Sequence, residues 1–361
     1  MEYKRLGDYI EPVDERNSKL EIKLSQGICN EKYFQDPRQV AENSAADKIV
    51  RRGYFDYNRA TTRNGEKISI AYREGPDCTV SSAYQVFRIK DEEKLNPKYL
   101  LMWYKRSDFD RYARFRSHGS AHEFFEYDEM CDVYLPLPDI DRQREIVEEY
   151  ETLSRCIRLN EQMIEKLEAT AQALYRKMFV DDIDKENLPE GWRMGTLGEV
   201  ANIKAGGDKP HDFSEVQTEE YNVPVYANGI ENKGIFGFTT KPVITTKSIT
   251  ISARGTIGYC FLRKRPFVPI VRLIVVIPHD EDVTQYLFYY LNNSNIKGSG
   301  SVQSQLTVPD MESKNIIIPP VPLIQEFNKQ VEIIDNSISF CEKENEKLIE
   351  LQSLLLAKMG Q

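Results

Sequence analysis

The segment PLPDIDRQREIV at residues 136–147 returns in altered form as PVPLIQEFNKQV at residues 320–331. This internal repeat constrains the fold more than any other feature of the sequence. The two segments align without a gap, and each follows a variable block that opens in a similar way, LGDYI at residues 6–10 and LGEVA at residues 197–201. The repeat predicts two copies of one plan, a variable block followed by a long helix.

Both segments after the prolines show the apolar spacing of a long helix that packs along one narrow seam. Apolar residues recur at alternating intervals of three and four, which is a heptad pattern. A helix of about 38 residues is roughly 57 Å long, and its apolar stripe is too narrow to be buried alone, so the two copies are expected to bury each other. Asn160 and Asn345 interrupt the seams. They either set the register of the pairing or face solvent.

Length and charge limit the function classes further. A chain of 361 residues favours two domains with connecting elements. The net charge of -9 argues against nucleic acid, but residues 233–272 contain eight Lys or Arg and no Asp or Glu, and local charge decides where a polyanion binds. The six cysteines are scattered without a CxxC pair, and no signal or membrane segment is evident, so a cytoplasmic location is predicted.

Several motifs, in their order along the chain, carry a family resemblance. LPEGWRMGTLGEV (188–200), YANGIENKGIFGF (226–238), ARGTIG (253–258) and GSGSVQSQLTVPDMESKNIIIPPVP (298–322) resemble the second target-recognition domain of specificity subunits from bacterial type I restriction-modification systems. GYFDYNRATTR (53–63), VSSAYQVFRI (80–89) and LPLPDIDRQREIV (135–147) resemble a different target-recognition subtype of the same family. The resemblance covers essentially the whole chain.

The resemblance implies an α+β fold with a pseudo-two-fold internal repeat, in which two α/β target-recognition domains are separated by two long antiparallel helices that form a coiled coil. The expected segments are target-recognition domain 1 (1–139), spacer helix 1 (140–180), a linker (181–192), target-recognition domain 2 (193–319) and spacer helix 2 (320–361).

The same resemblance implies a subunit without catalysis of its own that reads a bipartite duplex DNA target with an unspecified gap. Its partners would be duplex DNA, two methyltransferase (modification) subunits and restriction/translocase subunits, and no membrane association is implied. S-adenosylmethionine, ATP and Mg²⁺ are expected in those partner subunits, and no cofactor or metal is expected on this chain.

Candidate DNA contacts follow from residue chemistry. ARGTIG follows an alternating strand pattern and reads as a turn, where Gly255 and Gly258 allow close approach to a phosphate and Arg254 offers a bidentate contact. Gln303 and Gln305 lie on a loop of small residues, and glutamine suits the adenine edge. The alternatives are a plain hairpin turn for ARGTIG and a plain linker for the glutamine loop. The predicted DNA-binding residues are Tyr57, Asn58, Arg59, Arg63, Ser82, Tyr84, Arg114, Arg116, His118, Ser120, Asn228, Lys233, Lys247, Arg254, Thr256, Gln303 and Gln305.

The predicted spacer and partner positions lie on the two helices. One copy has glutamine at residue 143, as the family does, and the other has phenylalanine at residue 327, which predicts that one of two partner contacts differs. The positions are Gln143, Asn160, Leu167, Phe327, Asn345 and Leu348.

Two alternatives from other classes stay open. Asp77, Glu92 and Lys94 fit the spacing of a PD-ExK nuclease lexically, whose carboxylates would bind Mg²⁺. The other alternative is a scaffold that binds protein partners and has lost DNA recognition. The sequence has no phosphate-binding GxxxxGK[ST] loop, which fits a reading subunit whose partners perform the chemistry.

Overall fold

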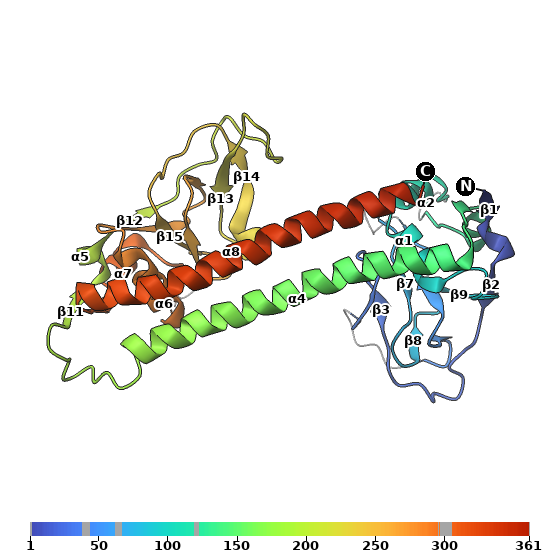
Figure 1. Cartoon of the computed structure of the whole chain (residues 1–361), viewed down its shortest axis with the longest axis horizontal. Helices are drawn as coiled ribbons and strands as arrows, with labels where there is room; N and C mark the ends of the chain where they lie inside the picture. Colours follow the sequence, from blue (N-terminus) through green and yellow to red (C-terminus); the bar gives the residue numbers. More distant parts are fainter. Residues whose placement is uncertain are drawn as a thin grey trace. The chain divides into compact units, whose positions relative to one another are not determined.

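The computed structural model describes residues 2–37, 44–61, 67–118, 123–294, 296 and 305–360 (Figure 1). The chain packs as two units. The first unit consists of Met1–Glu161 with Glu342–Gln361, and the second of Gln162–Cys341. Each unit therefore contains one α/β domain and a stretch of each long helix.

An antiparallel sheet with strand order β2-β9-β6-β7 forms the centre of the first domain. Aromatic residues on its strands pack against the helices α1 and α2, and Phe55 on β6 stacks on Phe87 of β9 with ring centroids 5.1 Å apart. Aromatic side chains suit strand positions because they pack well on a pleated surface. The elements are β1 (Tyr3–Arg5), η1 (Leu6–Asp8), β2 (Ile10–Val13), β3 (Gly27–Ile28), β4 (Phe34–Gln35), β5 (Lys48–Val50), β6 (Phe55–Tyr57), β7 (Ile70–Tyr72), β8 (Cys78–Val80), β9 (Gln85–Ile89), α1 (Pro97–Tyr104), α2 (Ser107–Phe115), α3 (Tyr127–Cys131) and β10 (Tyr134–Pro136).

The second domain contains an antiparallel sheet of order β12-β18-β15-β16 and a smaller sheet of order β14-β13-β17, in which β13 and β17 run parallel. The apolar run at residues 268–278 supplies β17 and the central strand β18, whose valines are buried. The elements are β11 (Arg193–Thr196), α5 (Leu197–Val200), β12 (Ala201–Ala205), β13 (Val223–Tyr226), η2 (Glu231–Gly234), β14 (Ile235–Thr239), β15 (Ser248–Ile251), β16 (Cys260–Arg263), β17 (Val268–Pro269), β18 (Ile274–Pro278), α6 (Val283–Asn293), α7 (Val308–Glu312) and β19 (Asn315–Ile318).

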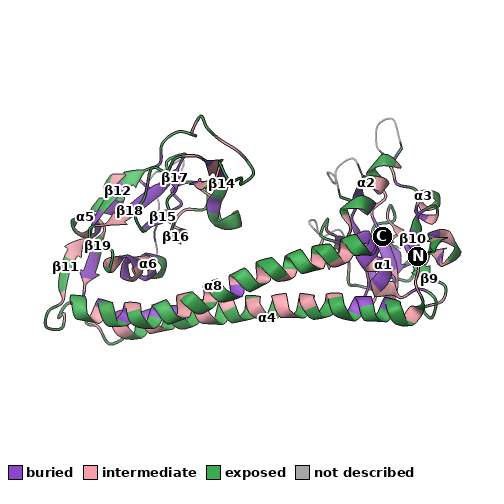
Figure 2. Ribbon diagram, turned by 45° about the horizontal axis from the view of Figure 1, so that its top comes forward, coloured by how far each residue is buried: buried purple, intermediate pink, exposed green. Residues whose placement is uncertain are grey.

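Two long helices, α4 (Ile140–Phe179) and α8 (Val321–Lys358), begin within the repeated segments, and Pro322 lies in the first turn of α8. This confirms the prediction of two long helices. Asp139 precedes α4, and its carboxylate accepts a hydrogen bond from the backbone N–H of Arg142 at 2.9 Å, which is the usual role of an N-cap aspartate. Figure 2 shows buried residues where the helices enter the domains and mainly half-buried or exposed ones between.

Within each unit the helix stretches run antiparallel. In the first unit, Ser154 bonds to Gln352 at 2.6 Å and Asn160 bonds to Asn345 at 2.9 Å, so residue numbers rise on α4 as they fall on α8. In the second unit, Phe179 near the end of α4 packs against Phe327 near the start of α8, with ring centroids 5.2 Å apart. Near the middle of the helices most seam residues, such as Leu167 and Leu348, are half-buried, although Cys341 is buried. Two helices alone enclose little of their shared apolar stripe.

Within the described ranges, we find no helix with the length and apolar character needed to cross a membrane.

Candidate nucleic-acid interface

Loops at one end of the β15–β16 hairpin form the first candidate surface, in the second unit. Asn228 joins two of them, because its side-chain N–H donates to the carbonyl of Val271 at 2.8 Å and its oxygen accepts from the N–H of Ala253 at 2.7 Å. Both observed bonds of the Asn228 side chain are therefore made within the domain, and its contact with DNA stays a prediction. It acts as an internal brace that fixes the loop carrying Arg254.

The turn between β15 and β16 presents Arg254 and Thr256 to solvent, and the strand-turn-strand prediction for this segment is confirmed. Gly255 and Gly258 have φ values of +69° and +90°, a region that glycine enters without the cost a side chain brings. The Arg254 guanidinium donates to the Gln305 side chain at 3.2 Å. Two residues far apart in sequence thus lie together at this surface.

Arg263 is a buried residue at this surface that the sequence analysis did not identify. It is 5% exposed, and its guanidinium lies 3.5 Å from the Tyr226 ring centroid. One N–H donates to Thr250 at 2.9 Å, and another donates to the carbonyl of Lys233 at 2.7 Å. Burial lowers the pKa of Arg263 to about 10. Arg263 is the last residue of β16 and lies in the segment 233–272, which has no Asp or Glu. This position is the sequence feature that could have identified it.

Arg263 holds the turn that carries Lys233. Asn232 and Lys233 have φ values of +48° and +54°, a left-handed conformation that costs free energy for residues with a Cβ. The bond from Arg263 to the Lys233 carbonyl stabilises this conformation and leaves the Lys233 side chain exposed. Buried Arg263 is therefore a positioning residue for exposed Lys233.

Lys247 lies away from this cluster. It precedes β15, whereas Arg254 follows that strand, and each strand residue advances about 3.4 Å. Its ammonium pairs with Glu281 at 3.6 Å. The structure does not bring Lys247 together with Arg254, because the two stand at opposite ends of one strand.

A second candidate surface, in the first unit, forms around Arg59. Its guanidinium donates to the carbonyl of Ala83 at 3.2 Å and to Glu126 at 3.0 Å, and it lies 5.8 Å from the Phe124 ring centroid. Arg59 thus lies against the exposed turn that contains Ser82. The predicted first-block residues at 59 and 82–84 are brought together by this contact.

The two neighbours of Arg59 in the predicted loop have structural roles. Asn58 accepts a hydrogen bond from the N–H of Ala60 at 3.0 Å, which shapes the loop. Tyr57 is fully buried on β6, and its hydroxyl donates to the carbonyl of Phe125 at 3.3 Å. Burial raises the pKa of Tyr57 well above its ordinary value. The prediction that Tyr57 contacts DNA is wrong, because strand alternation directs its ring into the core.

Tyr84 is half-buried and packs against the small cluster formed by Val50, Cys78, Val80 and Val86. Burial is the main reason that the pKa of its phenol is raised. Packing within the domain therefore accounts for most of the Tyr84 ring, which was predicted to contact DNA.

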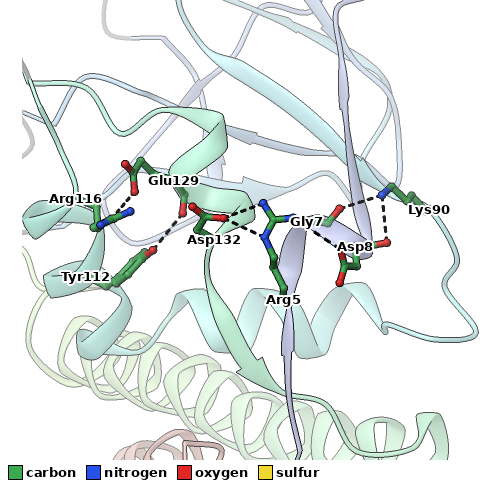
Figure 3. Close-up of polar contacts among 8 residues, drawn as sticks. All are labelled: Arg5, Gly7, Asp8, Lys90, Tyr112, Arg116, Glu129 and Asp132. Atoms are coloured by element: carbon green, nitrogen blue, oxygen red, sulfur yellow. Dashed lines mark hydrogen bonds and ion pairs between the residues drawn. The ribbon is translucent and has the colours of Figure 1, made fainter.

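The end of α2 carries the other basic residues of the first block, and Figure 3 shows part of their network. Arg116 pairs with the Glu129 carboxylate, whose other oxygen lies 3.9 Å from His118. Tyr112 donates to the Glu129 carbonyl at 3.3 Å. The bond to Glu129 raises the pKa of Arg116.

Arg114 follows the same pattern, with its guanidinium 2.5 Å from Glu123. Arg59, Arg114 and Arg116 therefore each hold a carboxylate partner within the domain. A DNA phosphate that binds them must replace these partners. Such exposed ion pairs contribute little free energy, so the exchange is feasible.

Three predicted DNA-contact residues, Arg63, Ser120 and Gln303, lie outside the described residues.

The two helix positions predicted to distinguish partner contacts are internal. Gln143 is fully buried, and its side chain bonds to the backbone of Lys94, Asn96 and Pro138 at 2.9–3.0 Å. Phe327 is fully buried in the second core. Each side chain attaches its helix to its own domain and is not exposed for a direct contact. The difference between the two partner contacts stays a prediction.

The remaining helix positions lie along the seam. Leu167 and Leu348 are half-buried. The Asn160 side chain donates to Asn345 at 2.9 Å and to Glu344 at 2.7 Å. Of the two roles left open for the asparagines, this bond favours pairing within the seam over two side chains that face only water.

The nuclease alternative finds no support. The Asp77 carboxylate accepts from the Arg51 side chain at 2.8 Å and from the Arg52 N–H at 2.9 Å, and Lys94 pairs with Asp91 at 3.2 Å. Among the residues that the structure describes, no group of three or more His, Cys, Asp or Glu is arranged to hold a metal ion.

Comparisons with known proteins agree with this geometry. The family model of the type I restriction modification DNA specificity domain matches residues 45–169 and 189–353. A Mycoplasma pneumoniae protein named as a type I specificity subunit is 29% identical over 303 residues, which are 81% of this chain and 87% of that protein. The specificity subunit of the Methanocaldococcus jannaschii type I restriction enzyme MjaIX is 22% identical over 298 residues, 73% of this chain and 68% of that subunit.

Solved structures show the same fold. The crystal structure of a type I restriction-modification S subunit from M. genitalium superposes with a TM-score of 0.58 at 14% identity, covering 100% of this chain and 96% of that one. A chain from a structural study of complex assembly and conformational transition in a type I restriction-modification system gives a TM-score of 0.52 at 18% identity, covering 100% and 97%.

Proposed function

Since this chain belongs to the type I restriction modification DNA specificity family and is a non-catalytic DNA-recognition subunit, we propose that each of its two α/β domains reads one half of a bipartite duplex target. The observation that carries the proposal is the double match of the family domain, once in each half of the chain. Two reading domains in one subunit imply two half-sites separated by base pairs that neither domain reads.

Each half-site would be read by the loop cluster of its own domain. In the second domain, Arg254 suits guanine or phosphate and Gln305 suits the adenine edge. In the first domain, Arg59 lies beside the turn that carries Ser82. Because the cations differ in position and pairing between the clusters, the two half-sites would differ in sequence. The target would then be asymmetric.

We further propose that the helical residues between the two domains determine the accepted gap. The 40 residues of α4 correspond to about 60 Å of helix, and the bond between Asn160 and Asn345 favours one register of the pairing. A fixed register gives a fixed number of helical residues between the domains. The subunit would therefore accept one gap length.

The proposed partners follow from the family. Type I specificity subunits work in complexes with DNA and other subunits, and we propose that this one seats two methyltransferase subunits and associates with restriction/translocase subunits in the cytoplasm. S-adenosylmethionine, ATP and Mg²⁺ would be bound by those partners.

Deletion of seven residues from each helix tests the gap proposal. Removing 161–167 and 338–344 keeps the heptad phase and retains both Asn160 and Asn345. Seven residues correspond to about 10 Å of helix, or about three base pairs of duplex DNA. Methylation-site mapping should therefore show the same two half-sites with a gap shorter by about three base pairs. Removing 161–167 alone serves as the control and should prevent correct assembly. An unchanged gap in the paired deletion would contradict the proposal.

A further inference from the structure

A pocket in the first unit lies between α1 and the N-terminal part of α4. Its floor is apolar, with Met102 and Val147 buried and Leu101 and Tyr150 half-buried. Charged side chains of both signs surround that floor. They are the cations Lys98, Lys105, Arg155 and Arg158 and the carboxylates Glu74, Glu148 and Glu151.

One cation of this pocket already has its partners. The Lys98 ammonium lies 3.2 Å from Glu74 and also bonds to Glu151. These two carboxylates share one lysine. Their negative charges also raise the pKa of Lys105, which opposes the lowering of that pKa by burial.

Lys105 has no ion-pair partner within the described part of the chain. Its ammonium lies 5.0 Å from the centroid of the Tyr150 ring, and burial lowers its pKa. A cation over an aromatic face gains some stabilisation. That contact does not replace the hydrogen bonds of a counter-ion, so a half-buried ammonium here remains poorly compensated.

The arginines of α4 divide into two groups. Arg142, Arg144 and Arg176 each pair with a carboxylate, at 2.8, 2.9 and 3.6 Å. Arg155 and Arg158 are exposed, lie one helical turn apart, and have no carboxylate partner among the described residues. The unpaired arginines of this helix are therefore the two that line the pocket.

We propose that this pocket binds an acidic side chain of a partner protein subunit, held by Lys105, Arg155 and Arg158. The proposal rests on the proposed function, which supplies the partner. A carboxylate on an otherwise apolar segment matches both the cations and the floor of Met102 and Val147. Duplex DNA fits less well, because its continuous run of phosphates would meet three carboxylates at the same pocket.

Carbodiimide cross-linking tests this contact directly, since the reagent joins an amine to a carboxylate that touches it. The full chain is assembled with its cognate methyltransferase subunit, treated, and analysed by peptide mass spectrometry. The expected product links Lys105 to an Asp or Glu of the partner. Links from Lys105 only to its own chain, or none, would overturn the proposal. Protection of Lys105 from amine acylation by duplex DNA alone would assign the pocket to DNA and overturn it as well.

Charge reversal gives a second readout. The double variant Arg155→Glu/Arg158→Glu should bind the methyltransferase subunit about tenfold or more weakly. Lys177→Glu is the matched control, because Lys177 is exposed on the same helix and lies outside the pocket. Equal affinity of the double variant and the unaltered chain would overturn the proposal. Arg155→Gln/Arg158→Gln should show a smaller loss and keeps the test valid if the reversed chain folds poorly.

Failure of the pocket and failure of the proposed function are distinguishable. Target-specific DNA binding by the assembled, unaltered complex is measured in parallel. Specific binding without the Lys105 link would reject the pocket alone, whereas absence of specific binding would count against the proposed function.

Discussion

Replacement of Arg254 by alanine separates base reading from phosphate binding in the second domain. Arg254 is exposed on the β15–β16 turn, and its observed partner is the neutral side chain of Gln305, at 3.2 Å. No ion pair within the described chain has to be broken before it binds DNA. Arg59 differs in this respect, because Glu126 must first release it.

The two possible roles of Arg254 predict different magnitudes. A bidentate contact to a base contributes about 1–3 kcal/mol of discrimination, which corresponds to about 5-fold to 150-fold in affinity for the target over a single-base variant. A phosphate contact lowers the slope of log K against log salt by about 0.9 and weakens all sequences alike. The free energy of unfolding should change by less than about 0.5 kcal/mol, since the side chain is exposed and has no acidic partner among the described residues.

The assay is titration of labelled duplexes with the assembled complex at several salt concentrations, using the target, single-base variants and unrelated DNA. Lys177→Ala is the matched control, because Lys177 is an exposed cation on α4 and lies outside both candidate loop clusters. We expect Arg254→Ala to change either the discrimination or the salt slope while the control changes neither. If affinity, discrimination and slope all match the unaltered chain, Arg254 is not in the interface.

Two further predictions concern buried charged groups. Asp56 is fully buried, and neither carboxylate oxygen has a hydrogen-bond partner among the residues that the structure describes. Burial raises its pKa well above the ordinary value. The folded protein therefore holds that proton more tightly than the unfolded chain, and stability is lost as pH rises from about 3.9 through the raised pKa. Asp56→Asn should remove this loss. The free energy of unfolding of the variant, measured by urea denaturation, should exceed that of the unaltered chain by more as pH rises. Identical pH profiles of the two proteins would refute the reasoning. Arg263→Met should destabilise the turn at residues 231–234 and speed amide hydrogen exchange at Ala227, whose N–H donates to the Gly234 carbonyl at 3.0 Å. Unchanged exchange would mean that the turn keeps its conformation without Arg263.

The helices could be predicted well because their signal is local. Heptad spacing and proline-marked starts depend on residues a few positions apart, and these features predicted two long helices. The unpaired apolar stripe also required a partner, which the internal repeat supplied. The pairing of Asn160 with Asn345 followed one of the two options that the seam allowed.

The candidate interface was predicted less completely, because exposure and pairing depend on which side chains fold against each other. Residue type suggested both Tyr57 and Arg59, yet the Tyr57 ring is buried in the core and the Arg59 side chain is half-buried at the surface. Asn228 offered the donors expected of a DNA contact, but its bonds connect two loops. Arg263 was missed because a cation in a strand gives no local sign that it supports a distant turn.

The sequence by itself therefore determined that this chain has two copies of a variable block followed by a long helix, since repeats and periodicity are encoded along the chain. The tertiary structure alone decided which polar residues are free to meet a ligand. Hydrogen-bond partners such as Gln305 for Arg254 come from distant segments, and burial depends on the whole domain. These are non-local properties, and no short stretch of sequence can specify them.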